Sequence, residues 1–62
     1  MFLELTRTDG AKTTFNTDNV ECICRTADET AAVRLVSGEL IGVREKYEIV
    51  RNKLLSLASK TN

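Results

Sequence analysis

Cys22 and Cys24, separated by one residue, are the side chains of this sequence whose type and spacing most suggest chemistry. On a strand both thiols point to the same face, with Cα atoms about 6.6 Å apart, twice the strand rise. That separation is near the upper limit for a disulfide, and the parallel Cα–Cβ vectors do not suit one. A structural zinc site needs four ligands, so two chains would have to share it. The favoured interpretation is two small buried apolar residues, as free cysteines often are in a reducing cytosol.

Catalytic apparatus is hard to find elsewhere in the sequence, which contains no histidine. Histidine is a common general base and the commonest metal ligand in proteins. The serines therefore lack the partner that activates a nucleophile, and Ser37 is better explained by a turn. Gly38 and Gly42 are not followed by the Lys-Ser/Thr pair of a phosphate loop. We therefore predict a non-enzymatic protein that uses no cofactor and no metal.

Size and composition describe one small domain spanning 1–62. The chain has 62 residues, of which 42% are hydrophobic and 29% are charged, and its formal net charge is zero. A domain of this size buries only about 60% of the surface of its unfolded chain and is marginally stable alone. A homodimer or a protein partner would supply further stabilisation. The zero net charge argues against a non-specific nucleic-acid coat, which would be strongly basic.

The sequence predicts a cytoplasmic protein that is not inserted in a membrane. An acidic residue, Glu4, stands where a signal peptide would carry basic residues before its apolar segment. The longest uninterrupted apolar run, 40–43, is far shorter than the roughly 20 residues that a transmembrane helix needs.

Alternating apolar and polar residues over the first two-thirds of the chain predict β-strands separated by turns. Asp9-Gly10 and Ser37-Gly38 are two-residue hairpin signals, because glycine tolerates the positive φ of a tight turn. We interpret the polar segments 16–19 and 27–30 as further turns. The predicted strands span 2–6, 12–15, 20–26, 32–36 and 39–44. The predicted fold is α+β, in which residues 1–44 form a small curved antiparallel sheet (a meander or partial barrel of four to five strands) followed by one helix.

The C-terminal helix is predicted over 45–60, where helix-forming residues predominate and neither glycine nor proline occurs. Its apolar stripe recurs at spacings of three and four, at Tyr47, Val50, Leu54, Leu57 and Ala58. Ile49 lies roughly opposite this stripe, and Leu55 lies on its flank. They are either singly exposed apolar residues, which are common, or a second face that meets a partner. The residues expected to bind a protein partner are Ile49, Leu55, Lys46, Arg51 and Lys53.

Charge is divided unevenly along the chain. Residues 1–39 contain four basic and seven acidic residues, whereas residues 40–62 contain five basic and two acidic residues. The resulting charges of −3 and +3 allow pairing within the chain, with a second copy, or with an acidic partner. An alternative function is phosphate contact in RNA or DNA, for which the candidates are Arg7, Arg34, Arg44 and Lys46. Nucleic acid is the less favoured partner, because only one Tyr and two Phe are available to stack on bases.

Turn and strand motifs follow one another in a distinctive order over residues 3–54. They are Leu5-Thr6-Arg7, Asp9-Gly10, Asn16-Thr17-Asp18, Glu21, Thr26-Ala27-Asp28, Val33–Gly38 and Val43-Arg44-Glu45. In this order they resemble the flagellar FlbD family, whose members include swarming-motility proteins. Ala27 stands where that family has proline, and Asp9 and Ser37 stand where it has asparagine. The resemblance implies a small non-catalytic accessory protein that acts by protein contact near the flagellar motor.

A fainter resemblance rests on Leu5-Thr6-Arg7 and Val43-Arg44-Glu45 alone. These motifs are similar to those of the carbon storage regulators, dimeric RNA-binding translational repressors of nearly this length. The chain lacks their Gly-x-Asn-Ala-Pro turn and their His-Arg-Glu-Glu segment. That resemblance implies RNA contact by Arg7 and Arg44. A third hypothesis is a phage- or plasmid-encoded protein that acts on a host protein.

Overall fold

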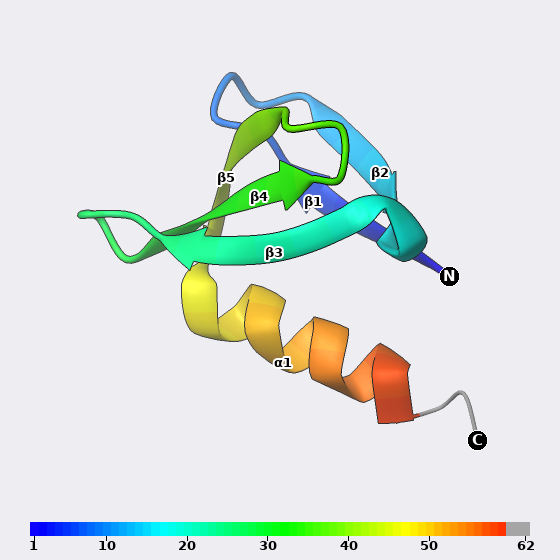
Figure 1. Ribbon diagram of the computed structural model, residues 1–62. Helices are drawn as coiled ribbons and strands as arrows, with labels where there is room; N and C mark the ends of the chain where they lie inside the picture. The colour runs from blue at the N-terminus through cyan, green and yellow to red at the C-terminus, as the bar shows by residue number, and fades with distance from the viewer. Residues whose placement is uncertain (60–62) are drawn as a thin grey trace.

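The computed structural model describes residues 1–59 and arranges them as five strands followed by one helix (Figure 1). The strands are β1 (Phe2–Thr6), β2 (Lys12–Asn16), β3 (Val20–Arg25), β4 (Thr30–Leu35) and β5 (Leu40–Lys46). A short 3-10 turn, η1 (Thr17–Asn19), joins β2 to β3, and the helix α1 spans Tyr47–Ser59. Within the described residues, no helix has the length and apolar content needed to cross a membrane. The predicted α+β fold with a C-terminal helix is confirmed.

All strand pairs are antiparallel, as the hairpin signals predict. β1 pairs with β2 in one sheet, and β3, β4 and β5 form a second sheet in that order. Gly10 and Gly38 lie in the predicted hairpin turns with φ angles of +93° and +96°, a region that residues with a Cβ rarely adopt. The curved sheet is thus present as two sheets that do not close into a complete barrel.

The two sheets are joined along a seam between β1 and β5. Arg7 forms an isolated antiparallel bridge with Val43, and the Thr8 N–H donates to the Gly42 carbonyl at 3.3 Å. A Cβ added to Gly42 would lie 3.3 Å from Cγ2 of Thr8. The strands therefore approach so closely at this point that a larger residue would force Thr8 to move.

A carboxylate extends the seam by one further contact. Both carboxylate oxygens of Glu45 accept a hydrogen bond from the Thr6 N–H, each at 2.9 Å. Partial burial acts to raise the pKa of Glu45, but this hydrogen bond and the positive charge of Lys12 outweigh it. The pKa of Glu45 therefore lies below its ordinary value of 4.5, so folding favours the ionised form that accepts the bond.

The core lies between the two sheets and α1, which Figure 1 shows on one side of both sheets. Its buried apolar members are Leu3, Leu5, Phe15, Ala31, Val33, Ile41, Val43 and Val50. Val50 is fully buried, and Leu54 and Leu57 pack against the same cluster from later turns of α1. The spacing of three and four residues thus directs one stripe of the helix toward the sheets, as predicted. The side chain of Ala58 and the whole of residue 60 lie outside the described part of the chain.

The helix begins two residues later than predicted, because Glu45 and Lys46 belong to β5. Lys46 pairs with Thr30 of β4, and Glu45 accepts the hydrogen bond from Thr6 of β1. Glutamate and lysine favour helices by intrinsic propensity, but these long-range contacts outweigh that preference. β5 accordingly continues beyond the predicted end at residue 44.

The prediction that Cys22 and Cys24 are buried is wrong, since both are exposed. A register shift between Val20 and Cys22 makes Glu21 a bulge in β3. The bulge changes which residues share a face, so that Val20 and Ile23 are the residues of β3 that pack against the core. The two cysteines consequently lie on the outer side of the strand.

Replacement of Glu45 by glutamine tests the seam. Loss of a charge-assisted hydrogen bond at a partly exposed site should lower the free energy of unfolding by about 1 kcal/mol at neutral pH. Because folding lowers the pKa of Glu45, its contribution is complete above the ordinary value of 4.5 and is lost as pH falls through the lower folded value. Urea unfolding of both proteins over a pH series should give stabilities that converge in acid. A difference that stays constant into strong acid would contradict a role for the ionised carboxylate.

The turn between β3 and β4 gives a second prediction, because Glu29 has a φ of 65°. A left-handed backbone costs a residue with a Cβ about 1 kcal/mol relative to glycine. Glu29→Gly should therefore raise the free energy of unfolding by about 0.5–1 kcal/mol. The matched control Gly38→Ala, at a φ of +96° with open space around it, should lower it by a similar amount. Urea denaturation measures both changes, and a less stable Glu29→Gly protein would show that Glu29 is not strained.

Candidate protein-binding site

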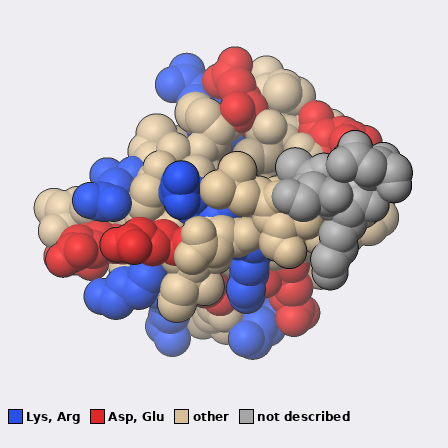
Figure 2. All heavy atoms as spheres, turned by 90° about the horizontal axis from the view of Figure 1, so that it is seen from below, with Lys and Arg blue, Asp and Glu red and all other residues tan. Residues whose placement is uncertain are grey.

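The basic residues considered for nucleic-acid contact do not form one patch. Arg34 lies opposite Leu40 in the β4–β5 ladder, so Arg44 is displaced from it by four residues, about 13 Å along the strand. Arg34 is paired with Glu21 at 3.3 Å, and Arg44 donates to the Thr8 carbonyl at 3.1 Å. Basic and acidic side chains are interspersed over the face shown in Figure 2. This arrangement does not supply the continuous basic surface that phosphate binding favours.

The two remaining basic candidates, Arg7 and Lys46, lie at the ends of different strands. Arg7 follows β1 and bridges to Val43 in the seam, beside Arg44. Lys46 is the last residue of β5 and lies opposite Thr30. Arg7 and Arg44 thus lie on neighbouring segments of the seam, and Lys46 lies two residues beyond Arg44 on β5.

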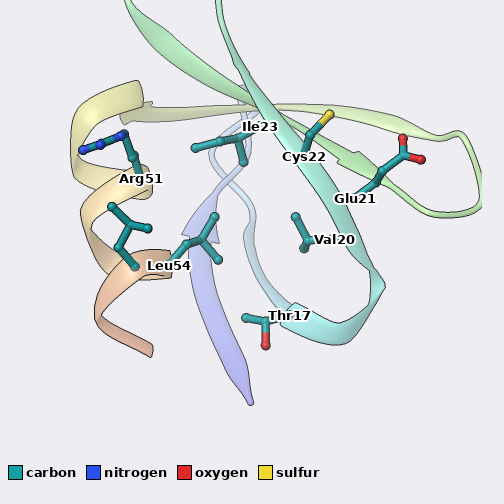
Figure 3. Close-up of a pocket in the computed structure, with 8 residues that line it drawn as sticks. Thr17, Val20, Glu21, Cys22, Ile23, Arg51 and Leu54 are labelled. Atoms are coloured by element: carbon teal, nitrogen blue, oxygen red, sulfur yellow. The ribbon is translucent and has the colours of Figure 1, made fainter. Parts of the chain in front are cut away.

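A groove lies between β3 and α1 (Figure 3). Its volume is about 250 Å³, and its lining residues are Thr17, Val20, Glu21, Cys22, Ile23, Arg51, Leu54 and Leu55. The four lining residues of β3 are consecutive, so the groove follows the edge of the strand and not one of its faces. We call this surface the β3–α1 groove.

The β3–α1 groove has an apolar floor and charged walls. Val20, Ile23 and Leu54 are half-buried and pack against the core, and Figure 3 shows Ile23 and Leu54 directed toward the space between strand and helix. The side chain of Leu55, on the helical wall, is 51% exposed. The charged residues of the two walls are Glu21 and Arg51. Apolar surface bordered by charges is the composition of a protein contact.

Cys22 also lines the β3–α1 groove, on the strand side. Desolvation by its surroundings, with smaller contributions from Cys24 and Glu21, raises the pKa of the Cys22 thiol. A raised pKa lowers the thiolate fraction at neutral pH and makes the thiol a poorer nucleophile. Across residues 1–59, no group of three or more Cys, Asp or Glu side chains is placed to hold a metal ion. The groove is therefore better suited to contact than to thiol chemistry.

The structure separates the five residues that the sequence suggested for partner binding. Arg51 and Leu55, one helical turn apart, line the β3–α1 groove. Lys53 lies on the opposite flank of α1, where it lines a second hollow of about 400 Å³ beside β1. Ile49 is four residues before Lys53 and shares that flank, with 49% of its surface exposed. Lys46 lies on β5 and lines neither hollow.

Sequence reasoning missed the strand side of the β3–α1 groove, which consists of Val20, Glu21, Cys22 and Ile23. Strict alternation along the strand pairs Val20 with Cys22, whereas the bulge at Glu21 turns Val20 and Ile23 to the same side. The one available signal is the spacing of three between these apolar residues. In a strand that spacing departs from the period of two and indicates an inserted residue.

Comparison with known families identifies the chain's relatives. The family model for FlbD, described as flagellar and swarming motility proteins, matches residues 2–61. The chain belongs to the FlbD family. No significant match is found among curated proteins or among solved structures.

Two of the motifs that resemble FlbD proteins meet in the β1–β5 seam. Leu5-Thr6-Arg7 supplies Thr6 and Arg7, and Val43-Arg44-Glu45 supplies their respective partners Glu45 and Val43. These motifs therefore have a structural explanation in this protein, because they hold its two sheets together. Among the residues that line the β3–α1 groove, Thr17 and Glu21 belong to the motifs of that resemblance.

Proposed function

We propose that this FlbD protein is a non-enzymatic accessory protein of flagellar or swarming motility that acts in the cytoplasm by contacting another protein chain. Membership of the FlbD family supports the role in motility. Free, exposed thiols support a reducing compartment, where cysteines stay unpaired. The β3–α1 groove is the observation that supports action by contact with another protein.

The β3–α1 groove supports protein contact because its exposed apolar surface is continuous with the core. An isolated exposed apolar residue needs no explanation, but Leu55 lines the same groove as Ile23 and Leu54. Covering the exposed half of the Leu55 side chain would contribute about 1 kcal/mol or more. Glu21 and Arg51, on opposite walls, would orient a partner that carries complementary charges.

The substitution Leu55→Asp tests this proposal in the cell. The protein is expressed in a flagellated bacterium whose own copy of the gene has been deleted, and swarming is measured on plates. A carboxylate in the groove would have to be desolvated by the partner, which is costly. Leu55→Asp should therefore leave swarming at the level of the deletion strain.

Ile49→Asp is the matched control, because Ile49 is on the same helix with nearly the same exposure, 49% against 51%. It lines neither hollow beside α1, so swarming should be restored. Both substitutions are at exposed sites and should change the free energy of unfolding equally, within about 0.5 kcal/mol. Full swarming with a folded Leu55→Asp protein, or equal loss with both variants, would contradict the groove as the contact surface.

A further inference from the structure

β3 is an open edge of the three-stranded sheet, and the β3–α1 groove follows this edge. Within residues 1–59, β3 is paired on one side only, with β4. The bulge at Glu21 interrupts the regular ladder, so the stretch that can accept another strand is 22–25. Proteins often protect such an edge with lysine or proline, and this stretch contains neither. Its free N–H and C=O groups are a template for pairing with another chain.

The hydrogen-bond pattern shows which backbone groups of β3 point outward. The Thr26 N–H donates to the Thr30 carbonyl at 2.9 Å, so the backbone groups of Thr26 point toward β4. This direction alternates from residue to residue along a strand. Cys24 therefore directs its backbone groups toward β4, and Ile23 and Arg25 direct theirs outward. An added strand would bond to Ile23 and Arg25.

The side chains of Ile23 and Arg25 lie on the face of the sheet that α1 covers. Residues two apart on a strand point to the same face. Ile23 packs against the core and lines the groove, and the guanidinium carbon of Arg25 lies 4.9 Å from the centre of the Tyr47 ring, at the first residue of α1. An added strand would therefore direct one side chain toward α1 beside Ile23 and another, two residues away, beside Arg25.

The end of the groove nearest Tyr47 is basic. Arg51, which lines the groove, follows Tyr47 by one helical turn and shares its flank, so Arg25 and Arg51 border the same end. Both are exposed, and within residues 1–59 neither forms an ion pair. Arg51 donates one long hydrogen bond, of 3.5 Å, to the neutral side chain of Asn52. Two neighbouring guanidinium groups favour a carboxylate, which can accept hydrogen bonds from both.

The acidic residue of the groove does not neutralise this end. Glu21 is paired with Arg34 at 3.3 Å, and Arg34 lies opposite Cys22 on the outer side of the sheet. The carboxylate of Glu21 is therefore directed away from α1. On the α1 side, the groove combines an apolar floor with a basic end.

We propose that the β3–α1 groove binds an extended segment of another protein, which joins the sheet as a strand beside β3 and carries an acidic side chain two positions from an apolar one. This inference rests on the proposed function and adds the conformation and the chemistry of the partner. The acidic side chain lies opposite Arg25, between the sheet and Arg51. The apolar side chain lies opposite Ile23, over the floor that Ile23 forms with Leu54.

The open edge and the basic end together select this partner. Main-chain hydrogen bonds to Ile23 and Arg25 give affinity for an extended segment, and the alternate side chains that face α1 give specificity. A helix lying in the groove would leave the outward N–H and C=O groups of β3 unpaired. A basic segment would be repelled by Arg25 and Arg51.

Selection from a phage-displayed library of random peptides tests the chemistry of the partner. The purified full chain is immobilised, and the enriched peptides should carry Asp or Glu two positions from Val, Ile or Leu. Selection with the double variant Arg25→Glu/Arg51→Glu should replace the acidic residue by Lys or Arg, because the charge of the groove end is reversed. Enriched peptides without an acidic residue, no enrichment, or the same acidic peptides with the double variant would overturn the proposal.

The affinity of the most enriched peptide, measured by fluorescence polarisation, tests the basic end with a matched control. Arg51→Glu should raise the dissociation constant by about tenfold or more. Lys53→Glu makes the same change of charge on the opposite flank of α1 and should alter it less than about twofold. An equal effect of the two variants would contradict a carboxylate bound at Arg51.

Amide hydrogen exchange, measured by NMR with and without a saturating amount of the same peptide, tests the added strand. The outward N–H groups of Ile23 and Arg25 should exchange rapidly in the free protein and at least about tenfold more slowly in the complex. The Cys24 N–H faces β4 and should be protected in both samples. Exchange at Ile23 and Arg25 that the bound peptide leaves unchanged would overturn the proposal.

The two proposals fail in different ways. Bound peptides that leave the Ile23 and Arg25 amides exposed, combined with loss of swarming in Leu55→Asp, retain the groove as a protein contact and remove the added strand. Acidic peptides that protect both amides, combined with full swarming of Leu55→Asp, retain the added strand and remove the role of the groove in motility.

Discussion

The seam between β1 and β5 is the interaction on which the rest of this structure depends. Its hydrogen bond from Thr6 to Glu45 joins residues 39 apart in the sequence. Without the seam, β1 and β2 would form an isolated hairpin, which is marginally stable in water. With it, Leu5 of β1 and Val43 of β5 belong to one core. The ionised carboxylate makes this connection sensitive to acid, and the absence of a side chain at Gly42 allows the strands to approach.

The seam also determines which surface remains available for contact. The three-stranded sheet has two edge strands, β5 and β3. The seam joins β5 to the segment that follows β1, and among the described residues β3 is left as the open edge. Because α1 begins two residues after Glu45, the position of the helix follows from the same contact. The β3–α1 groove is the space between that open edge and the helix. The protein's candidate site is therefore a consequence of how two small sheets are held together, and its charged and apolar residues are contributed by elements distant in sequence.

Local features of the fold could be predicted from the sequence, and long-range ones could not. Gly10 and Gly38 indicated their turns because a positive φ is a property of a few adjacent residues. The helical stripe around Val50 was predictable from spacing alone. The start of the helix was not, because Glu45 is held in β5 by Thr6 of a distant strand. For the candidate site, the helical residues Arg51 and Leu55 were identified, because helical periodicity places Leu55 beside the apolar stripe and Arg51 is one of the basic residues of the helix. The strand residues were missed, because the bulge at Glu21 depends on pairing with β4.

The joining of the two sheets by the β1–β5 seam can be measured by amide hydrogen exchange followed by NMR. The Thr6 N–H donates to the Glu45 carboxylate, and the Thr8 N–H donates to the Gly42 carbonyl. If the seam holds both sheets in one core, these two amides should be protected to the same degree as the paired amides of β4, because they open only when the whole molecule unfolds. Rapid exchange at Thr6 and Thr8, beside protected amides in β4, would show that the β1–β2 hairpin opens separately and would contradict the role of the seam.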